Sequence, residues 1–389
     1  MRIEPGCMIG FMGGGQLARM MALEARRMGY RIAVLDPDAD GPGAQVADCH
    51  VEGRLDDAAA AARLARQCAV VTVDTEHVPA DVLEHLETFT LVRPSSRVLR
   101  RIQDRLSQRH FLKEHDLPQT AFAPVQDAGS LRAGSRRVGF PAVLKTRRSG
   151  YDGKGQVSVS GPRELTHGWE ALAKAPAVIE ARVDFAMEIS VLLARGTDGR
   201  IEFHPTAENE HHRHVLHTSR VPAGIPAELD VRARELGARI AAALGHVGMM
   251  AVELFVTRDG GLLVNEIAPR THNSGHYSFG ACATSQFEQH IRAICGLPLG
   301  NPALLRPAVM LNLLGDFWRG GAPDFGGVMA LPEARLHLYG KSRAEPGRKM
   351  GHVLVMDNDI HRAAALAAGI DSALARPGAG GPRRESLAG

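Results

Sequence analysis

The stretch Met249-Met-Ala-Val-Glu-Leu-Phe-Val-Thr-Arg-Asp-Gly-Gly-Leu-Leu-Val-Asn-Glu-Ile267 consists of two apolar runs joined at Asp259-Gly260, a dipeptide typical of a tight β-hairpin. A two-residue turn there places Glu253 directly opposite Glu266. Like charges facing each other across a ladder, with Cβ atoms about 5 Å apart, destabilise a hairpin. Because both carboxylates are embedded among apolar residues, we favour a bridging Mg²⁺ over a slipped register or two solvated side chains.

A polar loop, Ala268-Pro-Arg-Thr-His-Asn-Ser-Gly-His276, follows the second strand of this hairpin. The loop is dense in hydrogen-bond donors and has no apolar periodicity. Its donors, at Arg270, His272, Asn273 and Ser274, are suited to clamping an anion such as bicarbonate or a sugar phosphate. A purely structural loop is the alternative, but the position beside the paired glutamates favours a binding site.

A second glycine-rich segment lies upstream, where the apolar strand Val143-Leu-Lys145 precedes Gly150-Tyr-Asp-Gly-Lys-Gly-Gln156. An ammonium group in an apolar strand requires an anionic partner. The loop amides, together with Lys154, can close over phosphates, although the run does not match a P-loop. An ordinary hairpin with a solvated Lys154 is the alternative, and the two lysines flanking one glycine loop favour phosphate binding.

The N-terminal turn Gly10-Phe-Met-Gly-Gly-Gly-Gln-Leu-Ala-Arg19 also predicts an anion site, because it joins a strand to the N-terminus of a helix. The spacing Gly13-x-Gly15-x-x-Ala18 fits the dinucleotide fingerprint, and Asp36 ends the next strand, where a ribose-binding carboxylate is expected. Alone, this pattern favours a nicotinamide enzyme. Glycines that merely allow close helix packing are the alternative.

The order of apolar runs predicts a mixed α/β and α+β fold. Short strands alternate with helices over the first 100 residues, which is typical of a doubly wound parallel sheet. After residue 117 hairpins dominate, interrupted by an amphipathic helix over 227–244. The 389 residues therefore divide into an N-terminal domain (1–117), a central domain (118–306), a small C-terminal β-rich domain (307–375) and a tail (376–389) with the composition of disorder.

Composition narrows the class of protein. A net charge of +3 favours individual anion pockets over a nucleic-acid-binding face. The five cysteines are odd in number and form no C-x-x-C pair, which argues against a disulfide framework or a thiolate zinc site and favours a cytoplasmic protein. We find no signal peptide or membrane-spanning run. The segment Glu210-His-His-Arg-His214 lacks an i, i+4 histidine pair on a predicted helix, so we reject a zinc site there.

Together, these segments resemble the ATP-grasp enzymes and, within them, the N5-carboxyaminoimidazole ribonucleotide synthetases of purine biosynthesis. The resemblance covers residues 8–357. It implies an ATP-grasp fold with a pre-ATP-grasp domain, a two-lobed centre and a C-terminal domain. It rests on Gly13-Gly-Gly-Gln-Leu-Ala-Arg-Met20, Asp74-Thr-Glu-His-Val78, Gln103-Asp-Arg105, Gly150-Tyr-Asp-Gly-Lys-Gly-Gln156, Asn265-Glu-Ile-Ala-Pro-Arg-Thr-His-Asn-Ser-Gly-His276 and Gly347-Arg-Lys-Met-Gly-His352.

The resemblance also implies a role for individual residues. Mg²⁺ would be held by Glu253 and Glu266. Residues implied to bind ATP are Arg105, Lys145, Gly150, Tyr151, Gly153, Gly155, Gln156, Glu180, Ala181, Arg182, Val183, Glu188, His211 and Asn265. Residues implied to bind aminoimidazole ribonucleotide are Gly15, Gln16, Leu17, Glu76, Arg270, His272, Asn273, Ser274 and Arg348. Residues implied to act in catalysis are Asp152, Lys154 and Lys349.

The implied reaction is an ATP-driven carboxylation in which bicarbonate attacks the γ-phosphate and the substrate amine captures the carboxyl group of carboxyphosphate. Small-molecule substrates and a homodimer are expected, without nucleic-acid or membrane partners. Ala268 stands where many ATP-grasp proteins have an Asn, so water or a phosphate oxygen would replace a third protein ligand. Alternatives are a formate-dependent glycinamide ribonucleotide transformylase, a nicotinamide dehydrogenase and a non-catalytic nucleotide-binding regulator.

Overall fold

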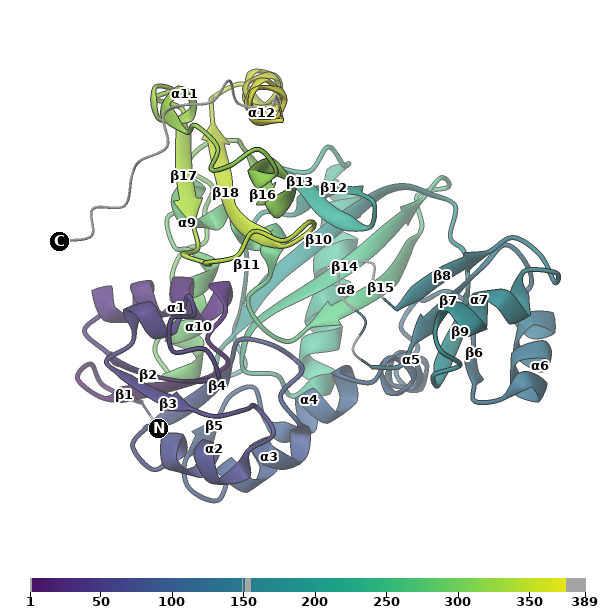
Figure 1. Ribbon diagram of the computed structural model, residues 1–389, viewed down its shortest axis with the longest axis horizontal. Coiled ribbons are helices and arrows are strands. Elements are labelled where there is room, and N and C mark those ends of the chain that lie inside the picture. Colours follow the sequence, from purple (N-terminus) through teal and green to yellow (C-terminus); the bar gives the residue numbers. More distant parts are fainter. Residues whose placement is uncertain (1, 149, 151–154, 376–389) are drawn as a thin grey trace.

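The structure is a computed structural model that describes residues 2–148, 150 and 155–375. Within these residues the strands form three sheets, of five, nine and four strands (Figure 1). No helix of the described chain is long and apolar enough to cross a membrane.

The N-terminal sheet is parallel, as its alternating pattern predicts, and has the strand order β3-β2-β1-β4-β5. The order reverses at β1 and β4, and ligands of such sheets bind at the carboxyl ends of the strands where this reversal occurs. The glycine-rich turn after β1 and the segment after β4 lie at this point. The strands are β1 (Met8–Met12), β2 (Arg31–Asp36), β3 (Cys49–Glu52), β4 (Val70–Val73) and β5 (Leu91–Val92).

Helices cover both faces of this sheet. One face packs on α1 together with α10, so the central part of the chain touches the N-terminal sheet directly (Figure 1). The other face packs on α2 and α3. The helices before the central region are α1 (Gln16–Arg27), η1 (Ala44–Val46), α2 (Ala58–Ala65), α3 (Ala80–Leu86), α4 (Ser96–Ile102) and α5 (Arg105–Glu114).

The four-stranded sheet, of order β6-β9-β7-β8, is covered on one face by α6 (Ala128–Val138) and α7 (Leu165–Ala171). Alternation along β7 buries Ala142 and Leu144 against these helices and turns Lys145 to the opposite face, toward the rest of the molecule. The strands are β6 (Phe122–Val125), β7 (Ala142–Thr146), β8 (Gln156–Val159) and β9 (Ala177–Ala181).

The nine-stranded sheet runs β15-β14-β10-β12-β13-β16-β18-β17, with β11 paired to β10. The C-terminal strands therefore continue the central sheet rather than forming a sheet of their own. Its strands are β10 (Phe185–Arg195), β11 (Ile201–Phe203), β12 (Ala207–His212), β13 (Val215–Val221), β14 (Gly248–Thr257), β15 (Leu262–Ala268), β16 (Ala308–Leu314), β17 (Ala334–Leu338) and β18 (Lys349–Met356).

Helices α8 and α12 cover this sheet, with α8 against β10 and β14 and α12 against β16 and β18. The sequence predicts α8 with its observed bounds, whereas α12 was not predicted. The remaining helices are α8 (Ala227–Leu244), η2 (Asn273–Gly275), α9 (Ser278–Ala281), α10 (Gln286–Ile294), η3 (Gly315–Trp318), α11 (Gly326–Met329) and α12 (Ile360–Leu374).

The hairpin formed by β14 and β15 places Glu253 opposite Glu266, as predicted, but its loop differs from the prediction. The loop has three residues (258–260), with Gly260 in the left-handed region at φ 79°. The longer loop shifts the register by one residue, and a β-bulge that leaves Asn265 unpaired shifts it back. The predicted turn type is wrong, and the predicted glutamate pairing is confirmed because the two irregularities compensate.

Candidate active site

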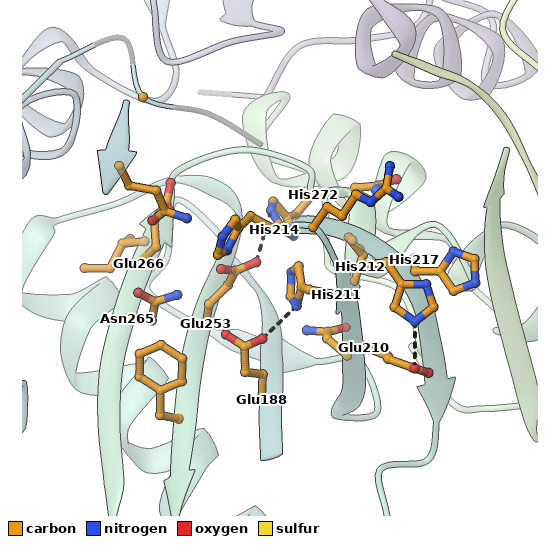
Figure 2. Close-up of a pocket in the computed structure, with 18 of the residues that line it drawn as sticks. Glu188, Glu210, His211, His212, His214, His217, Glu253, Asn265, Glu266 and His272 are labelled. Carbon is orange, nitrogen blue, oxygen red and sulfur yellow. Dashed lines mark hydrogen bonds and ion pairs between the residues drawn. The ribbon is translucent and has the colours of Figure 1, made fainter. Parts of the chain in front are cut away.

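A cavity of about 1850 Å³ lies where the three sheets meet. Figure 2 shows part of its wall, including the ends of β14 and β15. The predicted site residues that line this cavity are Gly15, Gln16, Leu17, Glu76, Arg105, Lys145, Gly150, Gly155, Gln156, Glu180, Ala181, Arg182, Val183, Glu188, His211, Glu253, Asn265, Glu266, Arg270, His272, Asn273 and Lys349.

Of the six other predicted site residues, two lie outside the cavity wall and four lie outside the described residues. Ser274 is fully buried behind the cavity wall, where its hydroxyl lies 2.9 Å from Nδ1 of His272. Arg348 does not line the cavity, and its guanidinium donates to the carbonyl of Arg343 over 2.9 Å. Tyr151, Asp152, Gly153 and Lys154 lie outside the described residues.

The facing carboxylates of Glu253 and Glu266 lie in the cavity wall (Figure 2). Burial and the charge of Glu266 raise the pKa of Glu253, because two carboxylates that face each other oppose ionisation. Nε2 of His272 lies 3.6 Å from Glu253 Oε1, but burial lowers the pKa of this histidine to about 3, so it adds no positive charge at neutral pH.

The donor set at this position fits a hard divalent cation such as Mg²⁺, because it offers two carboxylates with few other protein ligands. Within residues 2–148, 150 and 155–375, no cluster of three or more His, Cys, Asp or Glu side chains is arranged to hold a metal ion. Mg²⁺ typically completes its shell with water and substrate phosphate oxygens. Glu253 and Glu266 would therefore hold the ion only together with a phosphorylated ligand.

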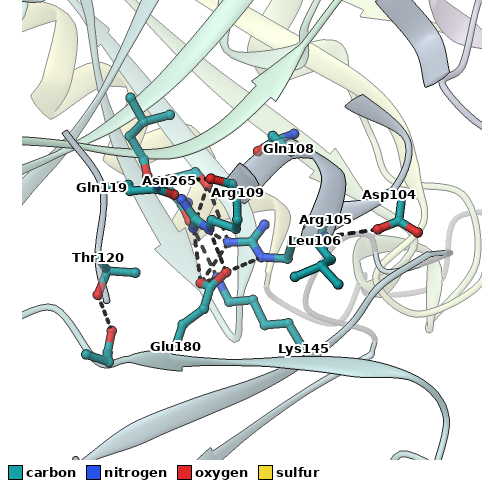
Figure 3. A network of polar contacts seen from close by, with 12 residues as sticks. Asp104, Arg105, Leu106, Gln108, Arg109, Gln119, Thr120, Lys145, Glu180 and Asn265 are labelled. Atoms are coloured by element: carbon teal, nitrogen blue, oxygen red, sulfur yellow. Dashed lines mark hydrogen bonds and ion pairs between the residues drawn. The ribbon is translucent and has the colours of Figure 1, made fainter. Parts of the chain in front are cut away.

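A cluster of three cations surrounds the buried carboxylate of Glu180 on β9 (Figure 3). Arg105 donates to it through Nε and Nη2 over 2.6 and 2.9 Å, and Arg109 through the same atoms over 2.7 and 3.1 Å. Lys145 Nζ lies 3.3 Å away. Burial opposes ionisation of Glu180, but these cations outweigh it and hold its pKa well below the usual range. One carboxylate thus faces three positive charges.

The surplus positive charge around Glu180 makes this part of the cavity suited to an anion. Burial and the neighbouring Arg105 lower the pKa of Lys145 to about 8, which is the direction expected of an ammonium group that lacks enough negative partners. Of the three cations, Arg105 and Lys145 line the cavity and Arg109 does not. Phosphate groups placed beside the first two would supply the missing negative charge.

The cavity edge formed by β10 and β12 carries an acid–base pair. Nδ1 of His211 lies 2.7 Å from Glu188 Oε2 (Figure 2). Burial disfavours protonation of His211, but its hydrogen bond to Glu188 and the negative charge of Glu188 outweigh burial. The pKa of His211 is therefore raised. Nearby in the cavity wall, Phe185 of β10 and Phe255 of β14 stack with ring centroids 4.8 Å apart. Sequence reasoning missed this pair, because an aromatic residue on a strand is usually a core residue.

Three backbone amides of the N-terminal glycine turn donate hydrogen bonds to carboxylates. Asp36 accepts from the Gly14 amide over 2.7 Å, and Asp74 accepts from the amides of Gly15 and Ala18 over 2.7 Å each. Asp36 is thus a structural acceptor, which removes the ribose contact that the dinucleotide pattern requires. The two residues between Gly15 and Ala18, Gln16 and Leu17, line the cavity.

Lys341, from the loop after β17, adds a cation beside this turn. Its Nζ donates to Oε1 of Gln16 over 2.7 Å and also to the carbonyl of Lys349. Sequence reasoning missed Lys341, because a single lysine in a loop carries no pattern and the contact spans 325 residues. The C-terminal part of the chain thus brings two lysines, Lys341 and Lys349, into the cavity wall, and Lys341 contacts the N-terminal glycine turn.

The polar loop after β15 completes the wall between the glutamate pair and the glycine turn. Arg270 forms a close ion pair with Glu76. Burial opposes ionisation of Glu76, but the charge of Arg270 outweighs burial and lowers the pKa of Glu76 to about 2. Asn273 is buried, yet neither Nδ2 nor Oδ1 has a hydrogen-bond partner among the described residues. Unpartnered buried amides are rare, so the Asn273 side chain offers a donor and an acceptor to a ligand or a water molecule in the cavity.

Known protein families match nearly the whole chain. Residues 7–103 match a ribonucleotide synthetase preATP-grasp domain, residues 110–287 an ATP-grasp domain, and residues 308–366 a phosphoribosylaminoimidazole carboxylase C-terminal domain. The chain is 42% identical over 354 residues to the N5-carboxyaminoimidazole ribonucleotide synthase of Bacillus subtilis (strain 168), a match that covers 91% of this chain and 92% of the relative.

Two solved structures are also similar. One is an ADP complex of an N5-carboxyaminoimidazole ribonucleotide synthetase, with a TM-score of 0.91, 42% identity, and coverage of 96% of this chain and 99% of the other. The second, an Aspergillus clavatus synthase in complex with ADP and 5-aminoimidazole ribonucleotide, has a TM-score of 0.88, 31% identity and coverage of 95% and 98%. The fold is therefore an ATP-grasp fold, and the chain belongs to the family of N5-carboxyaminoimidazole ribonucleotide synthases.

Proposed function

We propose that the chain is a ligase that carboxylates 5-aminoimidazole ribonucleotide to N5-carboxyaminoimidazole ribonucleotide, using ATP and bicarbonate, in purine biosynthesis. The observation that carries the proposal is the pair of facing carboxylates, Glu253 and Glu266, in one cavity with the cations Arg105 and Lys145. Such an arrangement suits a metal-bound polyphosphate. Family membership supplies the remaining argument, because the relatives named above are synthases of this kind.

ATP would lie between the four-stranded and nine-stranded sheets. Its phosphates would contact Arg105 and Lys145 and the glycine segment that ends at Gln156. Its base would lie against 181–183 and its ribose near Glu188 and His211, which line the same cavity. Mg²⁺ held by Glu253 and Glu266 would neutralise charge on the transferred phosphoryl group.

Aminoimidazole ribonucleotide would lie at the other end of the cavity. The amides of Gln16 and Leu17, at the N-terminus of α1, and the ammonium of Lys341 suit its phosphate. Glu76, fixed by Arg270, would face the ribose, and the unpartnered amide of Asn273 would be available to the substrate. The amides of Gln16 and Leu17, at the end of the parallel sheet, would then hold a substrate, where the glycine pattern alone favours a nicotinamide cofactor.

The reaction has two steps. A bicarbonate oxygen attacks the γ-phosphorus of ATP, so that a P–O bond forms, the bond to ADP breaks and carboxyphosphate results. The exocyclic amine then attacks the carboxyl carbon; the C–O bond to phosphate breaks, the amine loses one proton and phosphate leaves. Positioning and charge neutralisation account for most of the rate of such transfers. Asp152 and Lys349 are proposed to act on the amine and carboxyl groups, and Lys154 to close over the phosphates.

The related formate-dependent transformylase of glycinamide ribonucleotide is the second candidate in principle, but no observation on the cavity favours it. We further propose a cytoplasmic homodimer with domains at 1–117, 118–306 and 307–375. The tail expected at 376–389 lies outside the described residues. These proposals rest on composition and on the family resemblance.

The test is ADP release with each substrate left out in turn. We expect ADP release that requires both bicarbonate and aminoimidazole ribonucleotide, whereas formate with glycinamide ribonucleotide gives only background. ADP release that ignores the added ribonucleotide would overturn the proposed function.

A further inference from the structure

Arg109, on α5, is a charged side chain with no exposure to solvent and no part in the cavity wall. A buried guanidinium is costly unless every donor finds an acceptor. Its neighbour one helical turn earlier, Arg105, contacts the same carboxylate of Glu180 but does line the cavity. Of the two arginines that contact Glu180, only Arg105 can contact a ligand in the cavity, because Arg109 lies outside the cavity wall.

The guanidinium of Arg109 joins two sheets (Figure 3). On one side, Nε and Nη2 donate to both oxygens of Glu180 on β9, in the four-stranded sheet. On the other side, Nη1 donates to the carbonyl of Val264 over 2.9 Å and Nη2 to that of Asn265 over 3.1 Å, both on β15 in the nine-stranded sheet. The planar fork of an arginine can hold four such bonds at once, and a lysine cannot.

The two carbonyls that Arg109 holds lie at the β-bulge of β15. This bulge makes Asn265 the extra residue and brings Glu266 opposite Glu253. Oδ1 of Asn265 in turn lies 3.5 Å from Nζ of Lys145, in the cavity. Arg109 therefore fixes the segment that carries a proposed metal ligand.

Arg109 also keeps the buried carboxylate of Glu180 paired with a positive charge. If Arg105 and Lys145 turn toward phosphates, Glu180 loses two of its three cations. An uncompensated buried carboxylate would then oppose nucleotide binding. Arg109 stays in place because both of its ends are held by protein groups, and it keeps Glu180 paired in either state.

We propose that Arg109 is a positioning residue that sets the spacing between the phosphate-binding cations and the glutamate pair, and so links ATP affinity to Mg²⁺ affinity. This inference rests on the proposed function of the cavity. Neither sequence motif nor cavity wall includes Arg109.

The test compares Arg109→Lys with Leu112→Ala. Leu112 is a fully buried residue of the same helix that packs in the apolar core, so it is the control for lost stability alone. Each protein is titrated with the fluorescent nucleotide mant-ATP over a range of Mg²⁺ concentrations, and KM for ATP and for aminoimidazole ribonucleotide is measured. Melting temperatures are recorded alongside.

We expect Arg109→Lys to raise the mant-ATP Kd and the Mg²⁺ concentration for half-maximal binding by about tenfold each, because several charge-assisted bonds are lost. KM for the ribonucleotide should change less than twofold. Leu112→Ala should lower the melting temperature and leave these constants within twofold. Arg109→Gln, which keeps a donor for β15 but not the charge for Glu180, should weaken mant-ATP binding further.

Unchanged Kd values in Arg109→Lys, or equal losses for nucleotide and ribonucleotide, would overturn the proposal. So would failure of both Arg109 variants to fold while Leu112→Ala folds, because Arg109 would then serve stability alone. The mant-ATP readout does not require turnover. A wild-type protein that binds mant-ATP with Mg²⁺ but ignores the ribonucleotide would count against the proposed function and not against the role of Arg109.

Discussion

Glu253 lies directly opposite Glu266 although the loop between their strands is one residue longer than the simplest hairpin allows. The bulge at Asn265 makes up the difference. Bulges of this kind are common beside active sites, where they redirect a side chain. Here the bulge lets the consecutive residues Asn265 and Glu266 both line the cavity beside Glu253, whereas side chains of a regular strand would alternate between its two faces.

Glu266→Gln should abolish turnover and leave the fold intact. The substitution removes half of the charge that would hold Mg²⁺, so we expect ADP release to fall by at least about 100-fold. It also removes a like-charge pair, so the free energy of unfolding without nucleotide should stay constant or rise by up to about 1 kcal/mol. Steady-state kinetics and urea unfolding check both points. Turnover within tenfold of wild type would contradict the metal role.

Asp74→Asn should weaken binding of the ribonucleotide. The carboxylate of Asp74 accepts from the amides of Gly15 and Ala18, and an asparagine can accept only through one oxygen. One amide then loses its partner at a cost of about 1–3 kcal/mol, and the turn that presents Gln16 and Leu17 shifts. We expect KM for aminoimidazole ribonucleotide to rise about tenfold with KM for ATP nearly unchanged. A rise in KM for ATP alone would refute this assignment.

Lys341→Met should raise KM for the ribonucleotide by about 10- to 100-fold, because a hydrogen bond to a charged group contributes about 1.5–3 kcal/mol. The matched control is Lys174→Met, which removes an exposed lysine paired with Glu170 on the four-stranded-sheet lobe. Its KM values should equal those of wild type. Equal behaviour of the two variants would exclude Lys341 from the phosphate site.

Several buried histidines predict loss of stability in acid. Burial lowers the pKa of His204 to about 4, and that of His290 to about 3. In the unfolded chain these histidines have a pKa of about 6.5, so they take up protons at a higher pH than in the folded protein. The stabilisation is therefore complete above about pH 6.5 and falls as the pH drops toward 4, by up to about 1.4 kcal/mol per pH unit for each histidine.

His204→Gln provides the check, because Nε2 of His204 lies 3.0 Å from the carbonyl of Thr284 and a glutamine amide can donate there instead. The free energy of unfolding, measured with urea between pH 6.5 and 5, should fall less steeply with decreasing pH than in wild type. The difference in slope should correspond to about one proton. An identical slope in the two proteins would show that His204 does not contribute.

The sequence predicts the parts of the fold that depend on local patterns. The strand Val70–Val73 and the helix over 227–244 have their predicted bounds, since apolar periodicity alone defines them. The pairing of Glu253 with Glu266 also follows from counting along a hairpin. The parallel N-terminal sheet follows from alternating strands and helices.

Long-range features could not be predicted from such patterns. The contact of Lys341 with Gln16 joins residues 325 positions apart. The role of Arg109 depends on two sheets that meet only in the folded chain. The continuation of the central sheet through β16, β17 and β18 depends on the pairing of β13 with β16, which no local signal encodes.

The central claim is that bicarbonate takes the γ-phosphoryl group of ATP in the cavity beside Glu253 and Glu266. Its most direct test is turnover with ¹⁸O-labelled bicarbonate, ATP and aminoimidazole ribonucleotide, followed by mass spectrometry of the released phosphate. Attack by bicarbonate predicts one ¹⁸O atom in each phosphate, and Glu266→Gln should give background levels of labelled phosphate. Phosphate whose fourth oxygen comes from water, with ADP released at the same rate, would contradict the account.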